Sequence, residues 1–275
     1  MTDLKTTSLH RISELPLEAN AEIFRHYPAF KLGVTAAVRH YAQLLLPLVQ
    51  PLIANNTIFT APPITCHTPA AANLLCWELF EMCERKDLSS IDIRYDESMG
   101  ANEWTDPTRS RDYAKLNFAD RVTERELLSR RMVPNANFRG RPVLFVNDIC
   151  VTGAQQHTMQ RYFERLEAAC VRWLYVIVID PEIGRTQPDI EWQINLAPFE
   201  DLLRMVSGED IHFTGKCVQR LMHLGPPELD AILRALNKDR RTLLLDLAIR
   251  NGFENLDGFQ EQMQLLKFWA ADKRG

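Results

Sequence analysis

The sequence predicts an α/β fold with a mainly parallel sheet, chiefly because of the pattern in residues 142–179. Pro142–Val146 and Val171–Ile179 are apolar runs without polar alternation, as expected of strands that are buried on both faces of a sheet. Between them, Ala154–Ala169 is predicted to be a helix. Its apolar stripe consists of Met159, Tyr162, Phe163, Leu166 and the following Cys170. A strand, a helix and a strand joined this closely form a βαβ crossover, whose two strands are parallel.

Helices and strands also alternate through the first third of the chain. Val34–Leu46 carries apolar residues at helical spacing, and we expect Pro47 to end this helix. Thr57–Ala61 follows a turn and is predicted to be a short strand.

A loop over residues 64–69 then leads into a second helix. Ala70–Cys83 is strongly apolar, with Thr68 available as its N-cap and Pro69 at its first position. Ser90–Tyr95 alternates apolar and polar residues, which is typical of a half-exposed strand.

The next stretch, Asp96–Asp112, has no hydrophobic period and is predicted to be a mobile surface loop. Long loops of this kind often act as lids, and Arg109 and Arg111 could hydrogen-bond a diphosphate there. Asp120–Arg131 is predicted to be a charged helix or turn, and Pro134–Gly140 a connector.

Beyond the second buried strand, Ile190–Leu196 is a candidate last strand, after which the pattern becomes helical. Glycine, proline and asparagine divide that pattern into Leu229–Leu236, Thr242–Arg250 and Leu256–Ala271. We therefore expect an α/β domain over residues 1–200. Residues 201–275 would form a helical C-terminal appendage or hood of two or three helices.

Composition excludes several classes of protein. Of 275 residues, 46% are hydrophobic and 25% charged, as in ordinary globular proteins. The longest apolar stretches, Leu44–Ile53 and Val171–Ile179, are too short to cross a bilayer, and residues 1–14 lack the apolar core of a secretory signal. We therefore expect a cytoplasmic protein without a membrane partner. The net charge of −4 offers no general field for nucleic acid, and six cysteines without a CxxC pair argue against structural zinc.

The segment best suited to chemistry is the loop predicted over Asn147–Gly153. In a parallel sheet, ligands gather where strands end and helices begin. Backbone N–H groups at the start of the following helix can bind a phosphate, Gly153 lets the backbone approach it, and Thr152 adds a hydroxyl. Asp148 can accept hydrogen bonds from sugar hydroxyls, so the spacing fits a ribose 5-phosphate.

This segment resembles the phosphoribosyl pyrophosphate signature of the type I phosphoribosyltransferases. In that signature, an apolar strand is followed by two acids, two apolar residues, and Thr-Thr-Gly with a small residue and a further hydroxyl. The residues that match it are Asp148, Ile149, Thr152, Gly153 and Ala154. Asn147 stands in place of the first acid, Val151 of the first threonine and Gln155 of the last hydroxyl. The resemblance implies a type I phosphoribosyltransferase-like twisted, mainly parallel sheet flanked by helices.

The resemblance also implies a role for each segment. Asn147 and Asp148 would hold the ribose and are the candidate catalytic residues. The 5-phosphate would be bound by Cys150, Val151, Thr152, Gly153 and Ala154. The pyrophosphate would be bound by Thr65, Cys66, His67, Thr68, Arg109 and Arg111. Mg²⁺ is expected as part of the bound phosphoribosyl pyrophosphate, without a metal site made of protein residues.

A weaker similarity concerns the branch of the superfamily. The stretch from Lys115-Leu116-Asn117 through Arg121 loosely resembles the Leu-x4-Arg stretch upstream of the signature in ComF-like members. It points to a ComF-like branch of the kind found in bacterial stress or tellurium-resistance gene clusters. Relatives in the superfamily are commonly dimers, so a homodimer is also expected.

Several functions fit these residues. A phosphoribosyltransferase would transfer the phosphoribosyl group to a nitrogenous acceptor and release pyrophosphate. Because Asn147 carries no negative charge and Val151 removes a hydroxyl, the alternative is a non-catalytic protein that senses a phosphoribosyl ligand or nucleotide. A third hypothesis is the reverse reaction, in which a base and a sugar phosphate are formed. The plainest interpretation is a buried strand before a capped helix, with Asp148 ending the strand, and with His67, Arg109 and Arg111 merely solvated.

Overall fold

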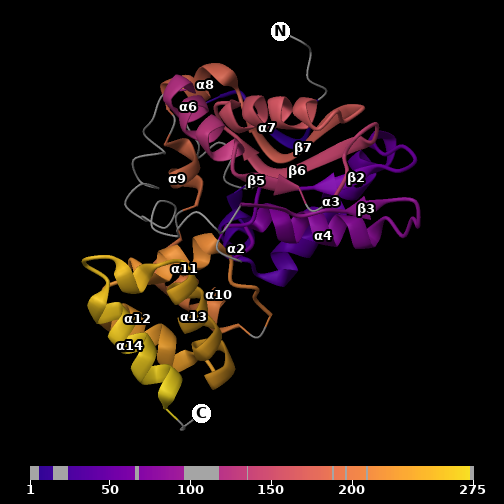
Figure 1. Cartoon of the computed structure of the whole chain (residues 1–275). Helices are drawn as coiled ribbons and strands as arrows, with labels where there is room; N and C mark the ends of the chain where they lie inside the picture. The colour runs from indigo at the N-terminus through magenta and orange to yellow at the C-terminus, as the bar shows by residue number, and fades with distance from the viewer. Residues whose placement is uncertain are drawn as a thin grey trace.

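The structure is a computed structural model of the 275-residue chain. It describes residues 6–14, 24–65, 68–95, 118–134, 136–187, 189–195, 197–208 and 210–272. Within these ranges, an α/β body is joined to a group of C-terminal helices (Figure 1). None of the helices in these ranges is both long enough and apolar enough to span a bilayer.

A five-stranded sheet forms the centre of the described α/β body. Its strands are all parallel and lie in the order β1-β7-β6-β2-β3. Their bounds are β1 (Thr6–Ile12), β2 (Ile58–Thr60), β3 (Ser89–Ser90), β6 (Pro142–Cys150) and β7 (Cys170–Ile179). A separate antiparallel pair is formed by β4 (Ile93–Tyr95) and β5 (Met132–Pro134). The predicted crossover is confirmed, because β6 and β7 are parallel neighbours.

Both faces of the sheet are buried, which explains the absence of polar alternation in β6 and β7. On β6, Leu144 and Val146 join one core, whereas Val143 and Phe145 join the core on the opposite face. The first face is covered by α2 (Tyr27–Leu32), α3 (Thr35–Val49) and α4 (Ala71–Met82). The second face is covered by α7 (Ala154–Arg165), with α6 (Phe118–Ser129) beside it. Figure 1 shows these two layers on either side of the sheet.

The chain beyond β7 is helical throughout its described part. Two short helices, α8 (Pro181–Thr186) and α9 (Ile190–Ile194), precede the C-terminal group. That group consists of α10 (Phe199–Ser207), α11 (Gly215–Met222), α12 (Pro226–Ala235), α13 (Lys238–Arg250) and α14 (Gln260–Ala271). Single 3-10 turns occur at Gln50–Leu52 and Phe253–Asn255. The C-terminal helices enclose an apolar core of their own, which confirms the predicted helical C-terminal region.

The C-terminal helices are attached to α2 through backbone contacts. The hydroxyl of Thr214, which is fully buried, donates to the Lys31 carbonyl oxygen at 2.7 Å and accepts from the Cys217 N–H at 3.1 Å. The His212 N–H donates to the Gly33 carbonyl oxygen at 2.9 Å. Gly33 ends α2 with a φ of 93°, a conformation that favours glycine, and a Cβ there would lie 1.8 Å from the His212 oxygen.

Two helix boundaries differ from the prediction. Pro47 does not end α3 but lies inside it, and the helix continues to Val49. The burial of its apolar face outweighs the hydrogen bond that a proline removes. The N-cap of α4 is Ala70, not Thr68. Ala70 has no polar side chain to cap the helix. Instead, its own N–H donates to the side-chain oxygen of Asn73 at 2.7 Å.

Several strands were also predicted wrongly or missed. Ser90–Tyr95 is divided between β3 and β4, which belong to different sheets. Ile190–Leu196 is not a strand, since α9 occupies this segment and buries Ile190 and Ile194 one helical turn apart. β1 was not predicted because it is an edge strand with only half-buried side chains along most of its length. Helices α10 and α11 were not predicted either.

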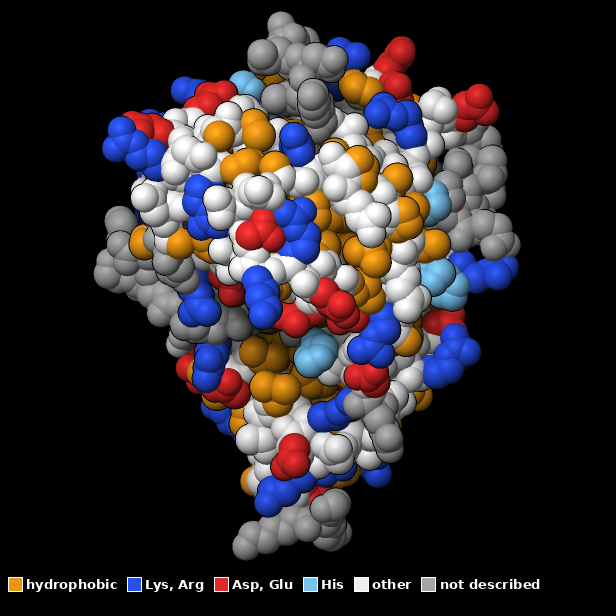
Figure 2. All heavy atoms as spheres, turned by 90° about the vertical axis from the view of Figure 1, so that its right-hand side faces the viewer, with side chains coloured by type: hydrophobic (Ala, Val, Ile, Leu, Met, Phe, Trp, Pro, Cys, Tyr) orange, Lys and Arg blue, Asp and Glu red, His pale blue; other side chains and the backbone are white. Residues whose placement is uncertain are grey.

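Charged side chains of both signs lie on the surface. On the face seen in Figure 2, basic and acidic side chains are interspersed, and the described residues there form no large patch of one sign. Binding of an anion therefore depends on the local arrangement of a few groups.

The contact between Gly33 and His212 can be tested by substitution. We expect Gly33→Ala to lower the free energy of unfolding by about 3 kcal/mol or more, because the methyl group adds a backbone clash to an unfavourable φ. Gly258 is a matched control, since its φ is 92° and nothing lies within 4 Å of its Cβ position. Gly258→Ala should cost only about 1–2 kcal/mol in urea denaturation. Equal losses in the two variants would contradict the close approach.

Candidate functional site

The candidate site lies at the carboxyl end of β6. The strand continues beyond its predicted end, because Asn147 pairs with Tyr175 and Cys150 with Val178 in register with β7. The loop predicted over Asn147–Gly153 is therefore reduced to a turn at residues 151–153. Asn147 and Asp148 are buried, with 2% and 7% of their surfaces exposed.

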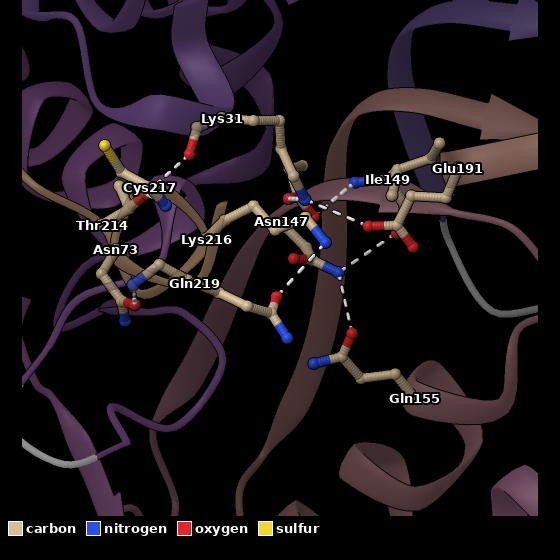
Figure 3. Close-up of polar contacts among 12 residues, drawn as sticks. Lys31, Asn73, Asn147, Ile149, Gln155, Glu191, Thr214, Lys216, Cys217 and Gln219 are labelled. Carbon is tan, nitrogen blue, oxygen red and sulfur yellow. Dashed lines mark hydrogen bonds and ion pairs between the residues drawn. The ribbon is translucent and has the colours of Figure 1, made fainter. Parts of the chain in front are cut away.

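Asp148 is paired with a lysine that the sequence analysis did not identify. The Nζ atom of Lys31, at the end of α2, forms an ion pair with Asp148 Oδ2 and another, at 3.1 Å, with Glu191 Oε1 of α9 (Figure 3). The second carboxylate oxygen of Asp148 accepts a hydrogen bond from the Ile149 N–H at 2.7 Å. The side chains of Lys31 and Asp148 are each only 11% exposed, so this is a largely buried pair.

The charges of this cluster support one another. Burial alone would lower the pKa of Lys31, but the carboxylates of Asp148 and Glu191 outweigh it and raise the pKa above the ordinary value of 10.5. Burial would raise the pKa of Glu191, but Lys31 and then Lys216 hold it below the ordinary value of 4.5. The stabilisation from Lys31 is complete below pH 10.5 and is lost as the pH rises through its raised pKa. That from Glu191 is complete above pH 4.5 and is lost as the pH falls through its lowered pKa.

Asn147 is engaged within the protein. Its Nδ2 atom donates to the Ile149 carbonyl oxygen at 3.3 Å and to Gln155 Oε1 at 3.1 Å. The amide thus occupies the place of the first acid of the signature and ties the strand to α7. Gln155, which replaces the last hydroxyl of the signature, is its partner, so the two departures from the pattern are in direct contact.

The turn after β6 leads directly into the start of α7. Gly153 is the N-cap of α7 with a φ of 76°, and the Ala154 N–H lies 3.4 Å from the Thr152 hydroxyl. The first N–H groups of a helix have no partner within it. α8 packs against the other side of the turn, where a Cβ on Gly184 would lie 2.1 Å from the Val151 carbonyl oxygen.

Cys150 is not an activated thiol. Burial raises its pKa, and the Gly153 N–H, the Tyr175 hydroxyl and Arg11 oppose that effect only in part. Cys150 is the last residue of β6 and pairs with Val178 of β7. The other described cysteines, Cys76, Cys83, Cys170 and Cys217, are free thiols as well.

The candidate pyrophosphate loop follows β2, the strand beside β6. Thr65 and Thr68 form an isolated bridge, and the Thr68 N–H donates to the Thr65 carbonyl oxygen at 2.9 Å. The hydroxyl of Thr68 accepts from Asn251 Nδ2 at 3.0 Å, which connects this loop to α13. Four predicted residues of this group lie outside the described ranges: Cys66, His67, Arg109 and Arg111.

In the described part of the chain, no group of three or more His, Cys, Asp or Glu residues is arranged to hold a metal ion. A hollow of about 490 Å³ lies between α6 and α7 and shares no residue with the signature. Its lining consists of Ser129, Arg130, Met132, Tyr162, Arg165 and Leu166. The candidate site therefore depends on the ends of secondary-structure elements and on the ion-pair cluster.

Lys31, Glu191 and Lys216 are the residues that sequence reasoning missed. They come from α2, α9 and α11, which are far apart in the sequence and meet only in the folded protein. Only Glu191 could have been suspected from local sequence, and only if residues 190–194 had been predicted as a helix instead of a strand.

The role of Lys31 can be tested through the stability of the fold. We expect Lys31→Met to lower the free energy of unfolding at pH 7 by about 3–5 kcal/mol, because it leaves the Asp148 carboxylate buried without its cation. Adding Asp148→Asn should restore most of the stability, since the amide oxygen can still accept from the Ile149 N–H. A double variant no more stable than Lys31→Met would argue against the ion pair.

Of the comparisons with known proteins, one identifies the family of the chain. No curated protein sequence matches significantly. One similar solved structure, described as an analysis of an invariant aspartic acid in HPRTs with a glutamine mutant, is 11% identical over 60% of this chain and 83% of that chain, with a TM-score of 0.29. A family model described as PRTase ComF-like matches residues 5–266, which span the sheet and most of the C-terminal helices. The chain therefore belongs to the PRTase ComF-like family.

Proposed function

We propose that this protein binds phosphoribosyl pyrophosphate and transfers its phosphoribosyl group to a nitrogenous acceptor, with release of pyrophosphate. The observation that carries the proposal is the end of β6, where Asp148 and a glycine-capped helix start follow one another within a few residues. Membership in the family supports the ligand class. The acceptor is left unassigned.

In this proposal the ligand spans two loops. The 5-phosphate would lie on the turn of residues 150–154, where helix N–H groups and Thr152 can donate to it. The ribose hydroxyls would donate to Asp148, and the Asn147 amide would take part only by releasing Gln155. The pyrophosphate would lie against the backbone of residues 65–68, with Arg109 and Arg111 as further candidates.

The described residues do not fit a protein-held Mg²⁺ ion. Asp148 and Glu191 are the carboxylates of the cluster, both face Lys31, and Asn147 is neutral. Mg²⁺ would therefore enter on the phosphate oxygens of the ligand itself.

The residues present suit catalysis by positioning. The acceptor nitrogen would form a bond to the anomeric carbon while the bond from that carbon to the pyrophosphate oxygen breaks and its electron pair leaves with pyrophosphate. A positive charge develops on the sugar during this step, and the Asp148 carboxylate beneath it would stabilise that charge. The ion pair with Lys31 and the hydrogen bond from the Ile149 N–H fix the orientation of this carboxylate.

One observation favours a second candidate function, a non-catalytic sensor of phosphoribosyl ligands or nucleotides. Asp148 is already neutralised by Lys31, and Asn147 is already hydrogen-bonded to Gln155. The ion pair with Lys31 weakens the negative charge available to a developing cation, and it leaves the turn of residues 151–153 intact. We keep a cytoplasmic location and a homodimer as parts of the proposal.

Calorimetric titration with phosphoribosyl pyrophosphate and Mg²⁺ tests the proposed ligand. We expect Asp148→Ala to weaken binding by about 10-fold to 100-fold, the value of one or two charge-assisted hydrogen bonds. Glu254→Ala, an exposed acid of the C-terminal region, should leave the affinity unchanged. Absence of binding by the unaltered protein, or equal binding by Asp148→Ala, would refute the proposal. Pyrophosphate release with a panel of bases would separate the transferase from the sensor.

A further inference from the structure

The C-terminal helices send a charged side chain into the candidate site. Lys216, in the first turn of α11, extends toward Asn147 and the Lys31 ammonium group (Figure 3). Its charge interacts with those of Glu191, Lys31 and Arg220. The side chain of Lys216 is exposed to solvent, and neighbouring parts of the protein lie close around it. An ammonium group from the C-terminal region is thus accessible to a ligand at the end of β6.

Lys216 lacks a strong partner among the described residues. Its hydrogen bond is a long, local one, 3.4 Å from Nζ to Gln219 Oε1. No carboxylate of the described part lies within 4.0 Å of its Nζ atom. Burial, Lys31 and Arg220 lower the pKa of Lys216, and only Glu191 opposes them. An anion bound beside Lys216 would relieve this repulsion.

The start of α11 also touches the candidate pyrophosphate loop. The Gly215 N–H donates to the Pro69 carbonyl oxygen at 3.0 Å, and Gly215 lies against the Thr68 methyl group. Lys216 follows directly in the sequence, so its backbone lies beside the loop after β2 while its side chain reaches toward the end of β6. A ligand that spans these two loops must pass Lys216.

The local charge balance favours a highly charged anion. Among the described residues, the charges of Lys31, Lys216 and Arg220 interact with one another or with the carboxylates, so these cations outnumber Asp148 and Glu191. Arg220 is held by the carbonyl oxygens of Asn195 and Ala197 and cannot easily move toward a ligand. Lys216 is the cation of this group that is free to do so, because its only described hydrogen bond is weak.

We propose that Lys216 binds the diphosphate group of the phosphoribosyl ligand, so that the C-terminal helices form part of the ligand site and supply the counter-charge that a protein-held metal would otherwise provide. This inference rests on the proposed function. It assigns the diphosphate to a residue outside the α/β body and distinguishes it from the 5-phosphate, which the turn after β6 binds.

Comparing two ligands separates this inference from the proposed function. Ribose 5-phosphate carries only the group that the turn would bind, whereas phosphoribosyl pyrophosphate adds the diphosphate. Both are titrated by calorimetry into the full-length protein, Lys216→Met, Lys216→Arg and the control Lys238→Met, which alters an exposed lysine of α13. Lys216→Met should weaken binding of phosphoribosyl pyrophosphate by about 10-fold to 100-fold. It should leave ribose 5-phosphate within about twofold of the unaltered protein, and Lys216→Arg should retain most of the affinity.

The other outcomes are equally informative. Unchanged affinity of Lys216→Met for phosphoribosyl pyrophosphate, or equal losses for both ligands, would overturn the assignment of the diphosphate. Failure of the unaltered protein to bind either ligand would overturn the proposed function itself, and this inference with it. The free energy of unfolding of Lys216→Met should equal or exceed that of the unaltered protein, because the substitution removes a repulsion with Lys31. A large loss of stability would indicate a structural role instead.

Discussion

The ion pair between Lys31 and Asp148 is the interaction around which the candidate site is organised. Removing two charges from water is costly, and a buried pair is stable only when further polar groups complete its bonding. Here Glu191 provides a second carboxylate for the lysine, and the Ile149 N–H satisfies the other oxygen of Asp148. Because the participants come from α2, β6 and α9, the pair fixes three segments relative to the end of the sheet.

The same lysine also joins the sheet to the C-terminal helices. Its side chain reaches Asp148, and its carbonyl oxygen accepts the hydrogen bond from Thr214 at the start of α11. Thr214 in turn caps the helix that carries Lys216. The position of Lys216 is therefore set by the residue that neutralises Asp148. This arrangement gives the C-terminal helices a structural reason to contribute to the site rather than only to cover it.

The parts of the fold that the sequence predicts are those governed by local patterns. Two long apolar runs around an amphipathic helix were enough to predict β6, α7 and β7, since burial on both faces of a sheet leaves a direct trace in composition. β1 and α9 were missed because an edge strand and a five-residue helix bury too few side chains to produce a clear period. The sequence pattern makes Asp148 and Gly153 candidates for the site, whereas Lys31 and Glu191 have no local signature. Their importance arises from contacts between distant segments, which a single sequence does not encode in any short window.

The parallel pairing of β1 with β7 also constrains how the chain reaches its folded state. Thr6 lies opposite Trp173 and Ile12 opposite Ile179, so β1 has its partner among much later residues of the α/β body. Contacts between such distant residues form slowly, because a long loop must be closed first. Until β7 has been synthesised, the backbone groups of β1 are available to strands of other chains. The edge of this sheet is therefore the region in which the nascent protein depends most on protection from aggregation.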